Sequence, residues 1–188
     1  MIQDVRLNTS TEVNPNIKLF AQEVFNNDEI KEINHVMFLS FSKNLEDNQS
    51  AGLILSSIIP TSPKRPLYYV NFEVSHGPQM VTRYVVHYLC AYLNTLLDDL
   101  AKDIGGFKRF IPFGGILRKI KGKINPELYD KLDKYNKLFY VPAKHNFNPY
   151  DAKDHLFSLK DAIYCCYITM KLKDAIESMS ISIKRKVD

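Results

Sequence analysis

Tryptophan is absent from this 188-residue sequence, and glycine is scarce, with only seven residues. Because glycine supplies most of the positive-φ positions that tight turns need, so few glycines exclude a fold dominated by loops. Cysteine is also rare. Cys165 and Cys166 are neighbours on a predicted helix, so their side chains point about 100° apart and cannot form a zinc site by themselves. We interpret them and Cys90 as small buried apolar residues in a reducing compartment.

Several motifs of catalysis and binding are missing as well. The sequence has no GxxxxGK[ST], no GxGxxG after a predicted strand, no HExxH and no CxxC, so neither a phosphate loop nor a zinc site is supported. Ser-His-Asp hydrolase signatures do not occur either. We therefore predict no metal and no cofactor. No apolar run approaches the ~20 residues of a membrane span, and the start does not resemble a signal peptide, so we expect a cytoplasmic protein without a transmembrane segment.

Acidic residues are missing from the segment between Ile104 and Pro126, which carries six basic ones against a net charge of +4 for the whole chain. Basic residues interleaved with Phe and Ile suit a polyanion such as RNA, or a nucleotide. A solvated lysine-rich loop with aromatic anchors is the simpler interpretation, and attachment to an anionic membrane surface is a weaker third. The candidate nucleic-acid-binding residues are Lys108, Arg109, Arg118, Lys119, Lys121 and Lys123.

The apolar content of 45% and the charged content of 24% are ordinary for a soluble globular protein, and the length suits one domain over residues 1–188. Residues 1–15 are polar, and we expect a loosely ordered arm there. Period-two alternation at about residues 67–75 predicts one short extended segment, pairing within the chain or between subunits. Helical patterns fill most of the remainder. We predict a mainly all-α fold, a bundle of about five to seven helices.

Capping residues, prolines and glycines set the expected helix boundaries. The terminal helix is expected from Leu159 to about Ser180, and its first half is apolar around most of its circumference, which is typical of a helix at the centre of a bundle. The other expected helices begin near Asn16, at an N-cap Asp28, at Gly77-Pro78 (ending near Ile104), at Ile116 (ending at Ile124) and at Asn125-Pro126, and Ser158–Asp161 resembles a capping box.

The helix expected from Pro78 has two distinguishable sides. One side carries the apolar residues that we expect to face the core, among them Val85, Leu89 and Leu96. The opposite side carries Arg83, His87, Cys90, Asn94 and Asp98, and we favour a solvated stripe over a cleft-facing one. Arg83, His87 and Asn94 nevertheless form a second polar constellation.

The stretch 126–147 is the strongest candidate for a functional site. Leu128, Leu132, Tyr135 and Phe139 recur at spacings of three and four, which indicates a helix with one buried face. We expect that helix to stop at Val141-Pro142, because the residue before a proline is disfavoured in the α region. Lys144 and His145 would then lie just beyond the break, where backbone groups and solvent are within reach.

The order of elements from residue 77 onward resembles a known family. A long helix, a basic linker and a short helix precede Asn136, Tyr140 and the segment 143–147 (Ala-Lys-His-Asn-Phe), and a capped apolar helix follows. This order is similar to the C-terminal half of HEPN-type helical domains, found in many prokaryotic antiviral and toxin–antitoxin proteins, over about residues 77–180. The resemblance implies an all-α and usually dimeric fold. In ribonucleases of that family it implies a metal-independent site with an arginine and a later histidine separated by four to six intervening residues.

His145 matches the histidine of that motif, whereas residues 138–140, which match its arginine, are Leu, Phe and Tyr. We therefore place first a non-catalytic nucleic-acid- or nucleotide-binding or regulatory module, in which His145 and Lys144 cap a helix end. The alternative is a metal-independent endoribonuclease. In it, His145 would move the proton of an RNA 2′-hydroxyl, while Lys144 and Lys137, or Arg83, stabilise the charge on phosphorus. Expected partners are RNA or a nucleotide, and a second copy in a homodimer.

Overall fold

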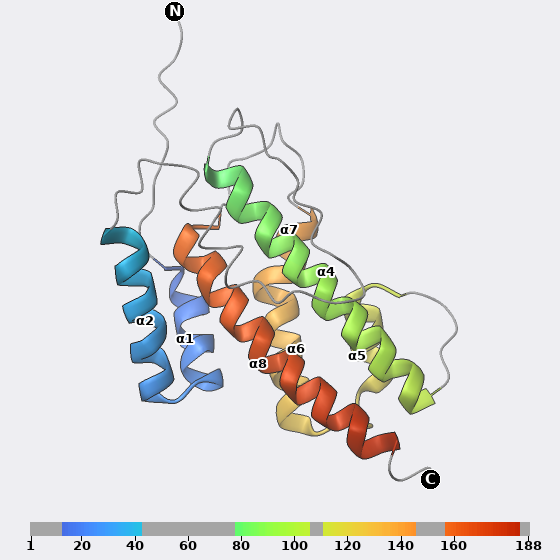
Figure 1. Cartoon of the computed structure of the whole chain (residues 1–188). Coiled ribbons are helices and arrows are strands. Elements are labelled where there is room, and N and C mark those ends of the chain that lie inside the picture. The colour runs from blue at the N-terminus through green and yellow to red at the C-terminus, as the bar shows by residue number, and fades with distance from the viewer. Residues whose placement is uncertain (1–12, 43–77, 106–110, 146–156, 185–188) are drawn as a thin grey trace, which may run out of the picture.

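A computed structural model describes residues 13–42, 78–105, 111–145 and 157–184, and the structural statements below concern these residues (Figure 1). They are helical almost throughout and contain no strand. The predicted all-α bundle is confirmed, with six helices in the described part when the three consecutive helical segments from Pro126 to His145 are counted as one. The extended segment expected at 67–75 lies outside these residues. The helices are α1 (Pro15–Val24), α2 (Asn27–Ser42), α4 (Pro78–Gly105), α5 (Phe113–Ile120), α6 (Pro126–Tyr135), the π-helix η1 (Asn136–Tyr140), α7 (Val141–His145) and α8 (Leu159–Lys184).

The two longest helices, α4 and α8, pack against each other along the middle of the bundle (Figure 1). Helices α1 and α2 pack on α8, and α5, η1 and α7 pack on α4. Residues 162–166 of α8 are each at most 2% exposed, so side chains on every side of this stretch are buried. This confirms the central position predicted for the apolar first half of the terminal helix. The helix continues to Lys184, one turn beyond the expected end.

The buried side of α4 is wider than expected. Leu93 and Leu97 are fully buried, but so are Cys90 and the polar residues Asn94 and Asp98, each at most 5% exposed. The solvated stripe predicted through these last three residues is therefore wrong. The reason is that α4 is covered by α8 and also by α5 and η1, so two of its sides face other helices.

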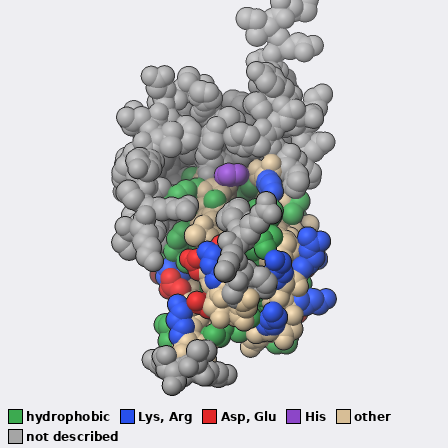
Figure 2. All heavy atoms as spheres, turned by 90° about the vertical axis from the view of Figure 1, so that its right-hand side faces the viewer, with side chains coloured by type: hydrophobic (Ala, Val, Ile, Leu, Met, Phe, Trp, Pro, Cys, Tyr) green, Lys and Arg blue, Asp and Glu red, His purple; other side chains and the backbone are tan. Residues whose placement is uncertain are grey.

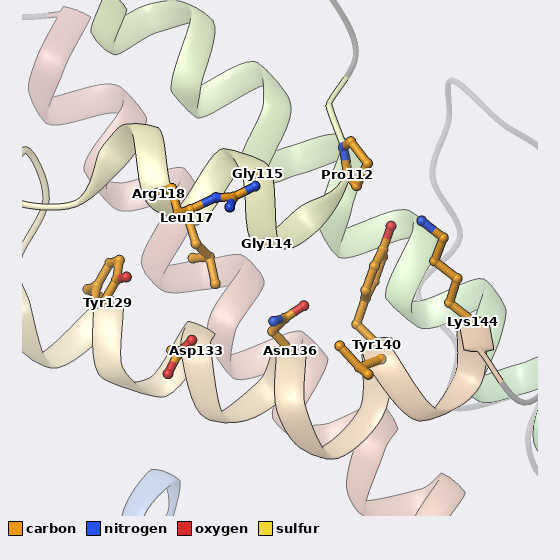
Figure 3. A pocket seen from close by; sticks show the side chains of 11 residues that line it. Pro112, Gly114, Gly115, Leu117, Arg118, Tyr129, Asp133, Asn136, Tyr140 and Lys144 are labelled. Carbon is orange, nitrogen blue, oxygen red and sulfur yellow. The ribbon is translucent and has the colours of Figure 1, made fainter.

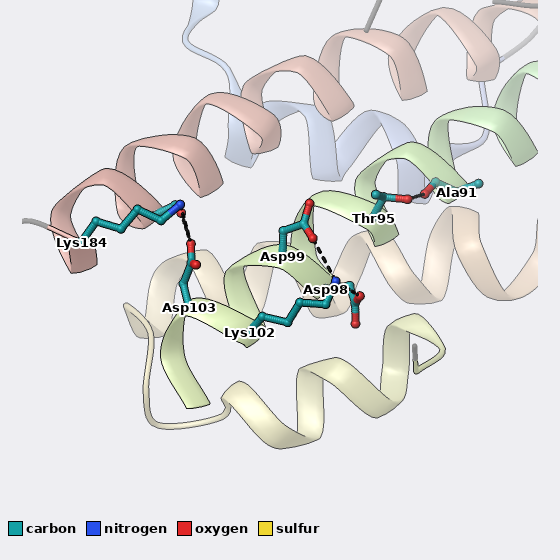
Figure 4. A network of polar contacts seen from close by, with 8 residues as sticks. Ala91, Thr95, Asp98, Asp99, Lys102, Asp103 and Lys184 are labelled. Atoms are coloured by element: carbon teal, nitrogen blue, oxygen red, sulfur yellow. Dashed lines mark hydrogen bonds and ion pairs between the residues drawn. The ribbon is translucent and has the colours of Figure 1, made fainter. Parts of the chain in front are cut away.

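The polar groups of the C-terminal half of α4 are engaged by ion pairs (Figure 4). The Lys102 ammonium lies 2.8 Å from a carboxylate oxygen of the buried Asp98 and 3.0 Å from one of Asp99. Asp103 pairs with Lys184 at 3.1 Å and also accepts a hydrogen bond from the Ser180 hydroxyl. Because Ser180 and Lys184 belong to α8, these contacts join the C-terminal ends of the two central helices.

Helix starts are fixed by side-chain caps. The Ser158–Asp161 capping box is confirmed: the Ser158 N–H donates to Asp161 Oδ2 at 2.9 Å, and the Asp161 N–H donates to Ser158 Oγ at 3.0 Å. The other oxygen of Asp161 accepts the Asn14 N–H at 2.9 Å, which ties the start of α1 to the start of α8. Helix α2 differs from expectation, because Asn26 rather than Asp28 accepts the N–H groups of its first turn.

A small polar cluster lies inside the core. Tyr135 of α6 is fully buried, and its hydroxyl lies 2.8 Å from Thr169 Oγ1. The Thr169 hydroxyl donates to the Cys165 carbonyl at 2.6 Å, so the Tyr135 hydroxyl is the donor to Thr169. Cys90 donates a weak hydrogen bond to the same tyrosine oxygen at 3.8 Å. All three cysteines are free and buried, as predicted.

Candidate ligand pocket

The helix that begins at Pro126 does not break at Pro142. It passes through the π-helix η1 and continues as α7 to His145, with the Val141 N–H bonded to the Asn136 carbonyl five residues back. The predicted break is wrong. A proline inside an α-helix clashes with the carbonyl four residues earlier. The wider π turn ends at Tyr140, two residues before Pro142, and such a turn relieves this clash while the chain stays helical.

This continuous helix presents one line of side chains to a pocket. Tyr129, Asp133, Asn136, Tyr140 and Lys144 follow one another at spacings of four, three, four and four, and all five line the pocket (Figure 3). Such spacings place residues on one face of a helix. The opposite face carries Leu132, Tyr135 and Phe139, all fully buried. The polar line and the apolar face are thus two sides of the same element.

Helix α5 and the residue before it form the facing wall, with Pro112, Gly114, Gly115, Leu117 and Arg118. The pocket is open to solvent, and its volume is about 390 Å³. Pro112 occupies the N-cap position of α5 and has no side-chain cap. The positive end of the α5 dipole therefore lies within this wall. The expected boundaries Ile116–Ile124 were set three to four residues too late, since α5 already begins at Phe113, where the buried ring packs beneath Tyr140.

The charge of the pocket is positive. Arg118 and Lys144 are exposed at its rim, and Asp133 is its acidic lining residue. The Lys137 ammonium lies 2.6 Å from Asp133 Oδ2, and this hydrogen bond raises the pKa of Lys137 above its ordinary value. Asp133 is therefore neutralised by Lys137 from outside the lining. The Lys144 ammonium lies 5.9 Å from the centre of the Tyr140 ring, within the range of a cation–π contact.

Asn136 is the most unusual polar group of the lining. Its Oδ1 atom is buried and has no hydrogen-bond partner among the described residues. An unmatched buried acceptor costs about 1–3 kcal/mol, so a fold keeps one where a ligand or another group satisfies it. The other such atom in the described part is Oδ1 of Asn94, which is 2% exposed and is not among the residues that line the pocket.

A basic surface adjoins the pocket. We use this term for Arg118, Lys119, Lys121 and Lys123, all exposed on α5 and the turn after it. In Figure 2, several Lys and Arg side chains lie along one side of this face of the molecule, and the acidic side chains visible there lie on the other side, next to further Lys and Arg side chains. Arg118 belongs to both the basic surface and the pocket. Lys108 and Arg109 lie outside the described residues.

The structure brings together part of the predicted site. Lys144 and Arg118, expected in two separate sites, line one pocket, whereas Lys137 reaches it only through Asp133. His145 is the last residue of α7, and Arg83 lies in the first turns of α4; the side chains of both are outside the described part. Of the predicted constellation of Arg83, His87 and Asn94, His87 is exposed and Asn94 is buried, while the side chain of Arg83 lies outside the described part.

Sequence reasoning did not select Tyr129, Asp133, Asn136 and Tyr140 as a group. The signal was present in their spacing, because every apolar face has an opposite face with the same period. The expected break at Pro142 concealed it, since a helix that ends at residue 141 cannot align Lys144 with Asn136.

Within the described ranges, no three His, Cys, Asp or Glu side chains converge in a way that could hold a metal ion. None of the described helices is long and apolar enough to cross a membrane. Comparison of the chain with protein-family models, with curated proteins and with solved structures found no significant match.

Proposed function

We propose that this chain is a helical module that binds single-stranded RNA. The observation that carries the proposal is the position of Arg118, which joins a pocket lined by Lys144, Asn136 and Tyr140 to the exposed basic surface. Single-stranded nucleic acid is held by cations that follow its backbone and by aromatic rings beside them that contact its bases. A basic surface next to a pocket with an aromatic lining supplies both.

The surroundings support a polyanion over other ligands. Residues 111–124 contain no acidic side chain, so a polyanion that follows this segment meets no carboxylate belonging to it. The pocket's acid, Asp133, is paired with Lys137. An RNA strand could therefore lie across α5 without passing an unpaired carboxylate of this segment or of the pocket.

Salt-titrated binding tests this proposal. We expect a labelled, unstructured RNA octamer to bind with an affinity that falls linearly with salt on logarithmic axes, because bound phosphates release counterions. Removing one contact with Arg118→Gln or with Lys121→Gln should lower the magnitude of that slope by about 0.7. Lys18→Gln is the charge-matched control, since Lys18 is exposed on α1, away from α5. Equal slopes in all four proteins would refute the proposal.

A metal-independent endoribonuclease is the second candidate, favoured by the position of Lys144. This lysine precedes His145 and lines the pocket, so a phosphate bound there would lie close to the last residue of α7. We expect His145→Ala to abolish cleavage in the presence of EDTA while leaving RNA affinity unchanged, since the imidazole would move a proton and Lys144 would hold charge. Cleavage by the purified variant at the wild-type rate would remove the catalytic role. The homodimer implied by the HEPN resemblance stays a prediction.

A further inference from the structure

The two cations of the pocket lie at different places along its length. Figure 3 shows Arg118 on α5, reaching toward Gly114 and Gly115, and Lys144 at the far end of the helix that forms the other wall. Asn136 and Tyr140 lie between them. A ligand that satisfies both cations therefore needs two separated negative charges, with an uncharged part between them that faces Asn136 and Tyr140.

The volume limits the size of that uncharged part. About 390 Å³ lies at the lower end of the range of small-molecule sites, which is about 300–1,000 Å³. One nucleobase with its sugar fits such a space, whereas a paired duplex or a folded peptide does not. The lining is also mixed in the way that base recognition needs, with an amide, two tyrosine rings and the glycines of α5.

Asn136 and Tyr140 are suited to a base. The amide of an asparagine presents one acceptor and two donors, a set that pairs with the polar edge of a nucleobase. Its acceptor Oδ1 is buried and has no partner among the described residues, so a donor on the base would satisfy it. The ring of Tyr140 is held in place by Phe113, with ring centroids 5.1 Å apart, which gives the base a fixed aromatic wall.

We propose that the pocket takes one unstacked nucleotide of a single-stranded RNA. Its base enters between α5 and η1 to meet Asn136 and Tyr140, and the phosphates on its two sides meet Arg118 and Lys144. This inference rests on the proposed function and adds to it that a base, not only the phosphate backbone, is bound. The recognition is noncovalent and leaves the RNA intact.

The test compares two octamers of equal charge. One is an unstructured RNA octamer containing all four bases, and the other is the same ribose-phosphate chain without bases. By fluorescence anisotropy at fixed salt, we expect the wild-type protein to bind the octamer with bases at least tenfold more tightly. Asn136→Leu keeps the side-chain size but removes the amide, so it should reduce this ratio several-fold and leave affinity for the abasic chain unchanged. Arg118→Gln and Lys144→Gln should weaken both ligands by the same factor.

A second measurement covers the case in which Asn136→Leu does not fold. An octamer with a single 2-aminopurine should change its fluorescence on binding to the wild-type protein, because the base leaves its stack and enters the pocket. Equal affinity for the two octamers, or an unchanged 2-aminopurine signal on binding, would overturn the inference and leave the RNA-binding proposal intact. Failure of both octamers to bind at low salt would overturn the RNA-binding proposal as well.

Discussion

At the scale of single residues, the buried Tyr135 hydroxyl shows how a polar atom is kept in an apolar core. It is bonded to Thr169 at 2.8 Å and accepts from Cys90, so its desolvation is matched by hydrogen bonds. Burial raises the pKa of Tyr135 and of the Cys90 thiol well above their ordinary values, because neither anion could be solvated there. Both groups therefore stay protonated in the folded state.

Because of these two groups, the unfolding free energy depends on pH in the alkaline range. Above the ordinary pKa of a free cysteine, about 8.5, and then of a tyrosine, about 10, the unfolded chain loses protons that the folded state retains. The contribution of these two groups to the unfolding free energy should therefore be constant below about pH 8 and fall as the pH rises from there. Urea denaturation at several pH values measures this. Tyr135→Phe, expected to cost about 1 kcal/mol at pH 7, should flatten the decline above pH 10; an equally steep decline in that variant would contradict the assignment.

At the scale of elements, helix α5 places two neighbouring glycines under opposite constraints. A Cβ added at Gly115 would lie 2.4 Å from Ile111 Cγ2, which is a clash. A Cβ added at Gly114 would lie 3.7 Å from Nδ2 of Asn136, an ordinary contact, on the wall of the pocket. Gly115 is required by packing, whereas Gly114 leaves open the space in front of Asn136.

Alanine at these two positions should therefore act in opposite directions on stability. Gly114→Ala should raise the unfolding free energy by about 0.4–1 kcal/mol, because it restricts the unfolded chain, yet weaken RNA binding by narrowing the pocket at Asn136. Gly115→Ala should lower it by about 1–3 kcal/mol through overpacking against Ile111. Chemical denaturation and anisotropy measure the two effects. A Gly114→Ala variant that binds RNA as tightly as the wild type would argue against the pocket.

The elements also show what sequence can and cannot predict here. Local signals sufficed where capping residues or apolar periods act alone, as in the Asn125 cap of α6, the Ser158–Asp161 box and the start of α4 at Pro78. They failed at Pro142, because a proline disfavours an α turn but not the π turn that precedes it here. They failed again at Asn94 and Asp98, since burial of a second face of α4 depends on where α5 and η1 dock.

The candidate site was predictable in composition but not in assembly. The basic character of Arg118 and the proximity of Lys144 to a helix end follow from the sequence. That Arg118 and Lys144 line the same pocket does not follow from the sequence. It requires a continuous helix through residue 142 and a turn at 121–125 that places α5 beside that helix. Such tertiary arrangements are set by packing of the whole core rather than by any one segment.

At the scale of the whole molecule, Asp161 links the start of α1 to the start of α8. One carboxylate oxygen accepts the Ser158 N–H within its own helix start, and the other accepts the Asn14 N–H at the start of α1. Asp161 is 4% exposed, and both of these hydrogen bonds are partly buried. Removing one acceptor oxygen should therefore leave a partly buried donor without its partner.

Two substitutions separate these roles. Asp161→Asn retains one acceptor oxygen and should cost about 1–3 kcal/mol of stability, while Ser158→Ala removes only the reciprocal cap and should cost about 0.5–2 kcal/mol. Hydrogen exchange should show faster opening of α1 in Asp161→Asn but not in Ser158→Ala, because only in the former do Asn14 and Ser158 compete for a single acceptor oxygen. Equal protection of α1 in both variants would show that packing on α8, not this hydrogen bond, holds it.

The bond between Asn14 and Asp161 joins residues 147 positions apart, and α1 and α2 both pack on α8, which follows them in the chain after all the other described helices. At roughly 5–20 residues per second, a ribosome needs on the order of ten seconds to make the intervening chain. Throughout that time Ile17, Phe20 and Ala21 lack the surface that later buries them. The nascent α1–α2 segment should accordingly bind cotranslational chaperones until α8 emerges from the ribosome.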